Sequence, residues 1–153
     1  MTIKNIFDKE VTDEVIARIN NLSTASTASW GKMNVAQMLA HCCVTYELIY
    51  EPHKHPEPNW LMKKVIQLFA KSTVVGPKPF SKSLRTAPAF LVSAEQDFEA
   101  QKTRLINYLI KTQTQGEGYF EGKVSHSFGK LTLSQWNTMF YKHIDHHLMQ
   151  FGN

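Results

Sequence analysis

Apolar residues recur at helical spacing in several stretches of this 153-residue chain. Each stretch has an apolar face and a polar face, which is the pattern of a helix that covers a core. The pattern predicts helices over residues 12–22, 35–50, 94–114 and 133–151, and a shorter helix over residues 60–71. The sequence has no internal repeat and no low-complexity tract. We therefore expect an all-α protein.

The ends of the predicted helices are marked by residues that satisfy free backbone groups. A small polar residue followed three positions later by glutamine is typical of a capping box at a helix start. Three such pairs stand close to the starts of predicted helices: Asn34 with Gln37, Ser93 with Gln96, and Thr132 with Gln135. Pro52 is expected to end the second helix, and Gly116 with Gly118 the third.

A long connection separates the second and third of the four main helices. It holds the short predicted helix over residues 60–71 and then a loop with Gly76, Pro77, Pro79 and Pro88. No convincing hairpin is indicated, although residues 119–128 have the composition of a short extended piece. Four amphipathic helices with one long excursion predict a single domain over residues 1–153, a four-helix bundle with a crossover connection.

Length and composition narrow the class of protein. A chain of 153 residues, 42% of them apolar, buries enough surface to fold without a disulfide or a metal. Cys42 and Cys43 are adjacent on a predicted helix and are expected to stay reduced, Cys42 in the core and Cys43 at an interhelical seam. No stretch is long and apolar enough for a membrane helix, and the first residues lack a secretory signal. We expect a cytoplasmic protein with no membrane partner.

Positive charge is concentrated in the middle third of the chain. The net charge is +4, and residues 59–94 contain no acidic side chain but six cations: Lys63, Lys64, Lys71, Lys78, Lys82 and Arg85. A nucleic-acid footprint usually combines its cations with exposed aromatic residues or a known motif, so no nucleic-acid partner is expected. Two interpretations stay open for this segment, a solvated basic face and a cationic rim for an anionic small ligand.

Three of the seven histidines fall where they can hold a metal ion together. His143 and His147 are four residues apart, so on a helix their rings lie one turn apart and can point to one place. Their stripe continues along apolar residues, which places both on the face that a bundle buries, whereas His146 points away. His41 lies on the inner stripe of the second predicted helix and is the candidate for a third ligand.

The donor set of this predicted cluster limits its chemistry. Three neutral imidazoles suit zinc or nickel, and also copper or iron, and leave a coordination position open for water or substrate. The alternative is that His143 and His147 serve only capping or core hydrogen bonds. Both zincin motifs are absent because Ile144 and His146 replace the required glutamate. The Glu-x-x-His pairs of di-iron bundles, phosphate-binding loops and nucleophile elbows are absent too.

The remaining histidines and the tryptophans are given simpler interpretations. His53 and His55 alternate with other residues in a proline-rich loop that is expected to be solvated. His126 precedes the last helix and reaches the cluster only if its loop folds over the bundle. The tryptophans are expected to be core or rim anchors, and these are Trp30, Trp60 and Trp136.

Two motifs give the chain a resemblance to a known superfamily. The first is WGKM at residues 30–33 leading to QMLAHC at 37–42, and the second is FGKLT at 128–132 leading to HIDHHLMQFG at 143–152. With these motifs the chain resembles the DinB-like metal-binding superfamily over nearly its whole length. The resemblance implies a four-helix bundle with a long crossover, a homodimer, and a divalent metal on His41, His143 and His147.

The resemblance also suggests an activity. Characterised members of that superfamily include metal-dependent transferases of small thiols such as bacillithiol, mycothiol or glutathione, and a maleylpyruvate isomerase. We therefore expect an enzyme that transfers a small thiol to an electrophile, with a non-catalytic metal or small-ligand binding bundle, or a structural protein with vestigial histidines, as alternatives. Because these thiols carry carboxylates, Lys78, Lys82 and Arg85 are the expected substrate contacts.

Overall fold

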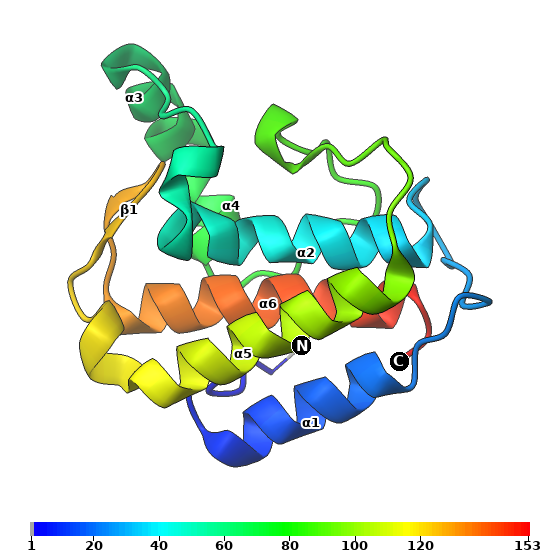
Figure 1. The fold of residues 1–153 in the computed structure, drawn as a ribbon. Coiled ribbons are helices and arrows are strands. Elements are labelled where there is room, and N and C mark those ends of the chain that lie inside the picture. Colours follow the sequence, from blue (N-terminus) through cyan, green and yellow to red (C-terminus); the bar gives the residue numbers. More distant parts are fainter. Residues whose placement is uncertain (1) are drawn as a thin grey trace.

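The computed structural model describes residues 2–153 of the chain, and these residues are mostly helical (Figure 1). Over this range there are six α-helices, two 3-10 helices and one two-stranded hairpin. The α-helices are α1 (Lys9–Asn20), α2 (Val35–Tyr50), α3 (Trp60–Phe69), α4 (Lys71–Val75), α5 (Phe98–Phe120) and α6 (Leu133–Gln150). The 3-10 helices are η1 (Pro52–Lys54) and η2 (Pro88–Phe90), and the strands are β1 (Val124–Ser125) and β2 (Gly129–Lys130). The expectation of an all-α protein is confirmed.

The four longest helices, α1, α2, α5 and α6, pack side by side around one apolar core (Figure 1). Helix α2 is the most deeply placed, because every residue from 35 to 47 except Gln37 is buried. At one end of the core the rings of Phe7, Phe120, Trp136 and Phe140 contact one another. Aromatic rings of this size supply a large share of the apolar surface that folding removes from water.

Two of the three predicted capping boxes form. Asn34 accepts a hydrogen bond from the backbone N–H of Gln37 at 2.8 Å, and helix α2 has the predicted bounds. The box of Thr132 and Gln135 starts α6 in the same way. The prediction for Ser93 and Gln96 is wrong, because α5 begins only at Phe98. There the Asp97 carboxylate accepts from the backbone N–H of Ala100 at 2.7 Å, and a carboxylate also favours the positive end of the helix dipole.

The break predicted at Gly116 is present, whereas Gly118 ends nothing. Gly116 has a φ of 68° and a ψ of 179°, which are not helical values, and a second helical segment continues from there to Phe120, so α5 is two segments joined at a kink. Phe120 is completely buried, so core packing holds the last turn in place despite the glycines. The β1–β2 hairpin follows and falls partly within the stretch expected to be extended, although no hairpin was indicated by the sequence pattern.

The connection from α2 to α5 is a crossover that contains η1, α3, α4 and η2. The predicted helix over residues 60–71 is present as α3, and α4 follows it. Trp60 is 75% exposed and is not a core anchor, whereas Trp136 is buried as expected. None of the helices within residues 2–153 is long and apolar enough to cross a membrane.

A buried lysine ties the crossover to α6. Lys142 has no exposed surface, and its ammonium group donates to the backbone carbonyls of Thr73 at 2.7 Å, of Lys78 at 3.1 Å and of Gly76. The same ammonium lies 4.5 Å from the centre of the Phe80 ring. Burial lowers the pKa of Lys142 to about 8. The segment from 73 to 80 is thereby held against the helix that carries His143 and His147.

Candidate metal centre

The three histidines predicted to meet do meet. His41 projects from α2, and His143 and His147 project from α6, so that one nitrogen of each lies within 4.8 Å of the other two. The Nε2 atoms of His41 and His143 are 2.9 Å apart. His41 and His147 are buried and His143 is partly buried. The three residues can therefore hold one metal ion between the two helices.

The crossover determines which nitrogen of His41 carries a proton. His41 Nδ1 lies 2.9 Å from the backbone carbonyl oxygen of Phe90, in η2. A carbonyl only accepts hydrogen bonds, so Nδ1 must carry the proton and donate. The lone pair of the neutral ring is then on Nε2, the nitrogen that faces His143.

A side-chain amide has the same effect on His147. His147 Nδ1 lies 2.8 Å from Gln150 Oε1, while Gln150 Nε2 donates to the Trp30 carbonyl at 2.5 Å. The second bond fixes the orientation of the amide, so its oxygen faces His147 and accepts. Gly31 makes this approach possible, because it has a φ of +86° and a Cβ there would lie 2.5 Å from Gln150 Nε2. Trp30 and Gly31 thus help to orient the Gln150 amide, and through it the His147 ring.

His143 is the adjustable member of the cluster. Its Nδ1 lies 2.9 Å from Thr45 Oγ1, and a hydroxyl can either donate or accept. With the His41 Nε2 lone pair facing it at 2.9 Å, His143 Nε2 must either carry a proton or share a cation with His41. A cation that accepts all three Nε2 lone pairs satisfies this arrangement, so the residues present fit a divalent metal ion.

The electrostatics of the cluster favour neutral imidazoles. Burial is the largest cause that lowers the pKa of His41, lowers that of His143 well below its ordinary value, and lowers that of His147 to about 3. Each neighbouring imidazole adds to the effect, because two positive rings this close repel each other. Neutral nitrogens do not have to lose a proton before they bind a metal ion at neutral pH.

Residues of the crossover form the walls around the cluster. The Phe80 and Phe90 rings stand edge-on to the His143 ring, with centroids 6.5 and 5.9 Å away. Next to them is a surface hollow of about 660 Å³ whose lining includes Phe80, Lys82, Trp30 and His146. His41, His143 and His147 do not line this hollow, so it lies beside the cluster, next to Phe80 and His146.

The three cations expected to contact substrate are placed differently. Lys82 lines the hollow, with its ammonium 4.6 Å from the centre of the Trp30 ring. Lys78 is exposed, and its backbone carbonyl accepts from Lys142. Arg85 is exposed. Of the three, Lys82 is the one that lines the hollow.

The other histidines lie outside the cluster. His146 is partly buried against Trp30 and Phe80, which agrees with its predicted orientation away from the metal ligands. His53 is exposed as expected. The expectation that His55 is solvated is wrong, because its Nε2 lies 2.6 Å from the buried Glu47 carboxylate. His126 lies 3.4 Å from the His55 carbonyl and does not join the cluster.

The two cysteines are free thiols without nucleophilic character. Cys42 is buried in the core, and the Cys43 Sγ lies 3.9 Å from the Gln101 carbonyl of α5, so both occupy the predicted places. Burial raises the pKa of Cys42 and raises that of Cys43 to about 12. Since the thiolate is the reactive form, neither cysteine is suited to attack a substrate at neutral pH.

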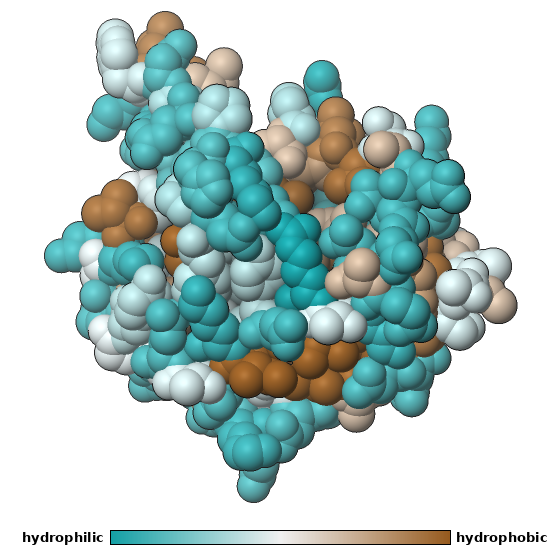
Figure 2. All heavy atoms as spheres, in the orientation of Figure 1, coloured by the Kyte–Doolittle hydropathy of each residue, from teal (hydrophilic) through white to brown (hydrophobic). Residues whose placement is uncertain are grey.

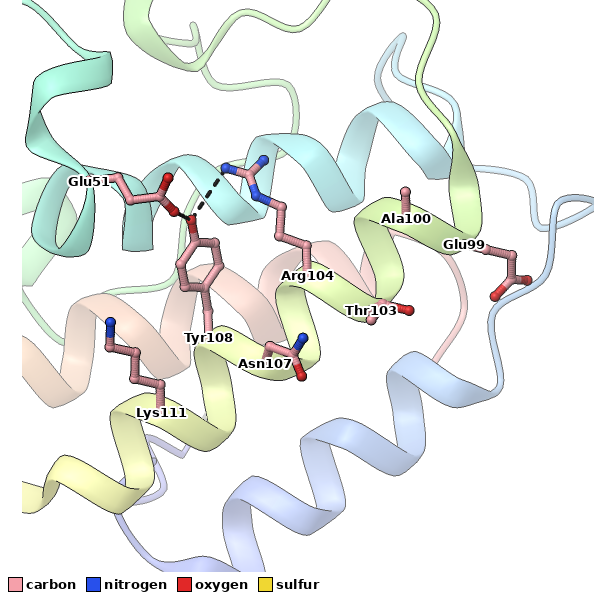
Figure 3. A pocket seen from close by; sticks show the side chains of 8 residues that line it. All are labelled: Glu51, Glu99, Ala100, Thr103, Arg104, Asn107, Tyr108 and Lys111. Atoms are coloured by element: carbon pink, nitrogen blue, oxygen red, sulfur yellow. Dashed lines mark hydrogen bonds between the residues drawn. The ribbon is translucent and has the colours of Figure 1, made fainter.

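A second concave site lies between the end of α2 and α5 (Figure 3). One of its two cationic groups, Arg104, already pairs with Glu47 and lies 3.3 Å from the Tyr108 oxygen, a contact drawn as a dashed line in Figure 3. Tyr108 in turn donates to Glu51. These polar groups satisfy one another, so the site has the character of a structural network between two helices.

The fold and the cluster define an all-helical protein with a candidate three-histidine metal centre. A family model described as "Protein of unknown function (DUF1569)" matches residues 3–153, so the chain belongs to that family. No curated protein and no solved structure matches the chain. The wider resemblance to the DinB-like superfamily therefore rests on the sequence motifs alone.

The sequence predicted the three clustered histidines but not the groups that orient them, Phe90, Thr45 and Gln150. Two of these had a usable signal. Thr45 follows His41 by four residues and Gln150 follows His147 by three, which are spacings that place side chains together on a helix. Phe90 gave no signal, because its contribution is a backbone carbonyl.

Replacing Gln150 by leucine tests the orienting role of its amide. The Gln150→Leu variant removes the acceptor for His147 Nδ1, so the metal affinity is expected to fall by about 10- to 100-fold. Competition with a chromophoric chelator measures this affinity. Met149→Leu, at an exposed neighbouring position, is the matched control and should bind as the unmodified chain does. Equal affinity in a folded Gln150→Leu protein would show that His147 needs no such partner.

Proposed function

We propose that this protein is a divalent-metal-dependent enzyme that transfers a small thiol to an electrophile. The observation that carries the proposal is the convergence of three imidazoles, two of which have Nδ1 committed to an acceptor that leaves the Nε2 lone pair free. Orienting partners of this kind are typical of histidines that ligate metals. The three ligands are His41, His143 and His147, and zinc or nickel is the proposed ion, with iron as a further candidate.

Kinship with the DinB-like superfamily is part of the proposal. It is supported by the packing of α1, α2, α5 and α6 with a long crossover between α2 and α5, which is the arrangement expected of a four-helix bundle of that type. The two sequence motifs map onto this arrangement, since one carries His41 and the other carries His143 and His147. A homodimer is proposed on the same resemblance.

The metal ion would supply a Lewis acid that lowers the pKa of a bound thiol so that thiolate persists at neutral pH. The residues of the chain hold and shield that position. Thr45 Oγ1 lies where it can donate to or accept from His143, so it can follow a change in the tautomer of that ring. Phe80 and Phe90 exclude water from the side of His143 that faces the crossover.

A cation beside the hollow supports an anionic substrate. Lys82 lines the hollow, and the two carboxylates of the same lining, Glu14 and Asp145, are each paired with a cation. Small cellular thiols carry carboxylates. A charge-assisted hydrogen bond from Lys82 to such a carboxylate would orient the thiol. Lys78 and Arg85, exposed on the same crossover, are proposed as weaker contributors to this field.

The proposal is tested on protein purified without chelators. We expect close to one divalent ion per chain by elemental analysis. The metal-loaded protein should then consume glutathione, mycothiol or bacillithiol in the presence of 1-chloro-2,4-dinitrobenzene, forming a carbon–sulfur bond and releasing chloride, and chelation should abolish the reaction. A bound ion without turnover of any of these thiols would favour a non-catalytic metal-binding protein. Absence of any bound ion after metal reconstitution would refute both functions.

A further inference from the structure

Helix α3 is oriented in an unusual way. It projects from the body of the molecule (Figure 1), and none of its residues is buried. Its apolar side chains are the exposed ones, with exposures of 58% for Leu61, 73% for Leu68 and 73% for Phe69. Met62 and Val65 are exposed as well. Brown atoms reach the surface at the tip of this projection (Figure 2).

Polar groups of α3 and of the residue that follows Ala70 contact the rest of the protein. Lys71, just after α3, donates to the carbonyls of Phe128 and Lys130 in the hairpin region, and Gln67 lies against Gly129. An amphipathic surface helix normally does the reverse and buries its apolar face against the core. The outward apolar face of α3 is therefore available to a partner outside the described chain.

The charge around this face indicates what kind of partner fits. Trp60 and Lys64, four residues apart and both exposed, form one edge of the face. Helix α3 itself contains no acidic side chain, and Glu57, just before it, is paired with Lys63 at 2.7 Å. A second copy of the chain would bring the same positive edges together, which opposes association. An anionic surface has the complementary charge.

We propose that α3 is a membrane-surface helix that inserts its apolar face into the headgroup region of anionic phospholipids. A helix with leucine and phenylalanine on its outer face and tryptophan and lysine at the edge of that face is suited to this position. Trp60 and Lys64 lie where an aromatic ring and an ammonium meet the lipid–water boundary. The sequence pattern alone predicted no membrane partner, because the direction of the apolar face depends on tertiary packing. This inference does not rest on the proposed metal chemistry.

Co-sedimentation of the full metal-loaded chain with vesicles tests the proposal. Vesicles of 30% phosphatidylglycerol in phosphatidylcholine are expected to bind the protein at least tenfold more tightly than pure phosphatidylcholine vesicles. The double variant Leu68→Ser, Phe69→Ser should bind the anionic vesicles at least tenfold more weakly, and Lys64→Gln about fivefold more weakly. Ile110→Ser, at an exposed apolar position of α5, is the matched control and should bind unchanged. All four substituted residues are exposed in the structure, and circular dichroism checks that each of the three variants is folded.

Two outcomes would overturn the proposal. One is the absence of binding to anionic vesicles at millimolar lipid, or equal binding by the double variant. The other is a concentration-dependent dimer that the double variant abolishes, measured by sedimentation equilibrium without lipid, because it would assign the apolar face of α3 to a second copy of the chain.

Discussion

Replacing His147 by alanine is expected to leave the protein with less than about a tenth of its metal content, because two nitrogens hold an ion far more weakly than three. His147 is buried, and the space its ring leaves lies between α2 and α6. The fold should survive, because the apolar core does not depend on the cluster. Elemental analysis after gel filtration measures the content, and helical circular dichroism measures the fold.

His146→Ala is the matched control for this variant. His146 is the adjacent residue on the same helix, its ring packs on the rings of Trp30 and Phe80, and it is not part of the cluster. It should keep its metal. If His146→Ala lost the ion while His147→Ala retained it, the assignment of ligands on α6 would have to be reversed.

Replacing Lys142 by methionine is expected to have the largest effect on stability. The substitution leaves the carbonyls of Thr73, Gly76 and Lys78 without their donor at a partly buried place. Unsatisfied buried acceptors cost about 1 to 3 kcal/mol each, and removal of a desolvated charge offsets part of this, so we expect a net loss of about 3 kcal/mol. For a chain of this length that corresponds to a fall in Tm of about 6 to 12 °C.

Lys9→Met is the control for the lysine substitution. Lys9 is 75% exposed at its side chain and pairs with Asp13 within α1, so its replacement should change stability by less than about 0.5 kcal/mol. Thermal unfolding followed by circular dichroism compares the two variants. A Lys142→Met protein as stable as the unmodified chain would mean that the cost of burying the ammonium cancels its three hydrogen bonds.

The sequence predicted the parts of the fold that local chemistry decides. The bounds of α2 and the caps at Asn34 and Thr132 follow from side chains that bond to backbone groups three residues away. The break at Gly116 was predicted from the glycine, whereas the helical segment that continues to the buried Phe120 is held by tertiary packing and was not. The interpretation of Trp60 as an anchor failed because its exposure depends on where α3 packs.

The residues of the candidate site that lie on one helix were the easiest to predict. His143 and His147 are recognisable from their spacing alone, and His41 followed from its place on an inward stripe. Lys142, next to His143, was not recognised as an anchor, because its three partners are backbone carbonyls of a distant segment. Every residue has a backbone carbonyl, so the sequence does not show which carbonyls accept such hydrogen bonds.

Phe90 contributes to the histidine cluster in two independent ways. The group that sets the tautomer of His41 is the carbonyl of Phe90, whereas the Phe90 ring faces the cluster from the crossover. Any amino acid that keeps η2 in place can provide the carbonyl. Replacing the ring is therefore expected to change the wall of the site without changing the protonation of His41. The shape of the site can thus be engineered at position 90 separately from its acid–base state.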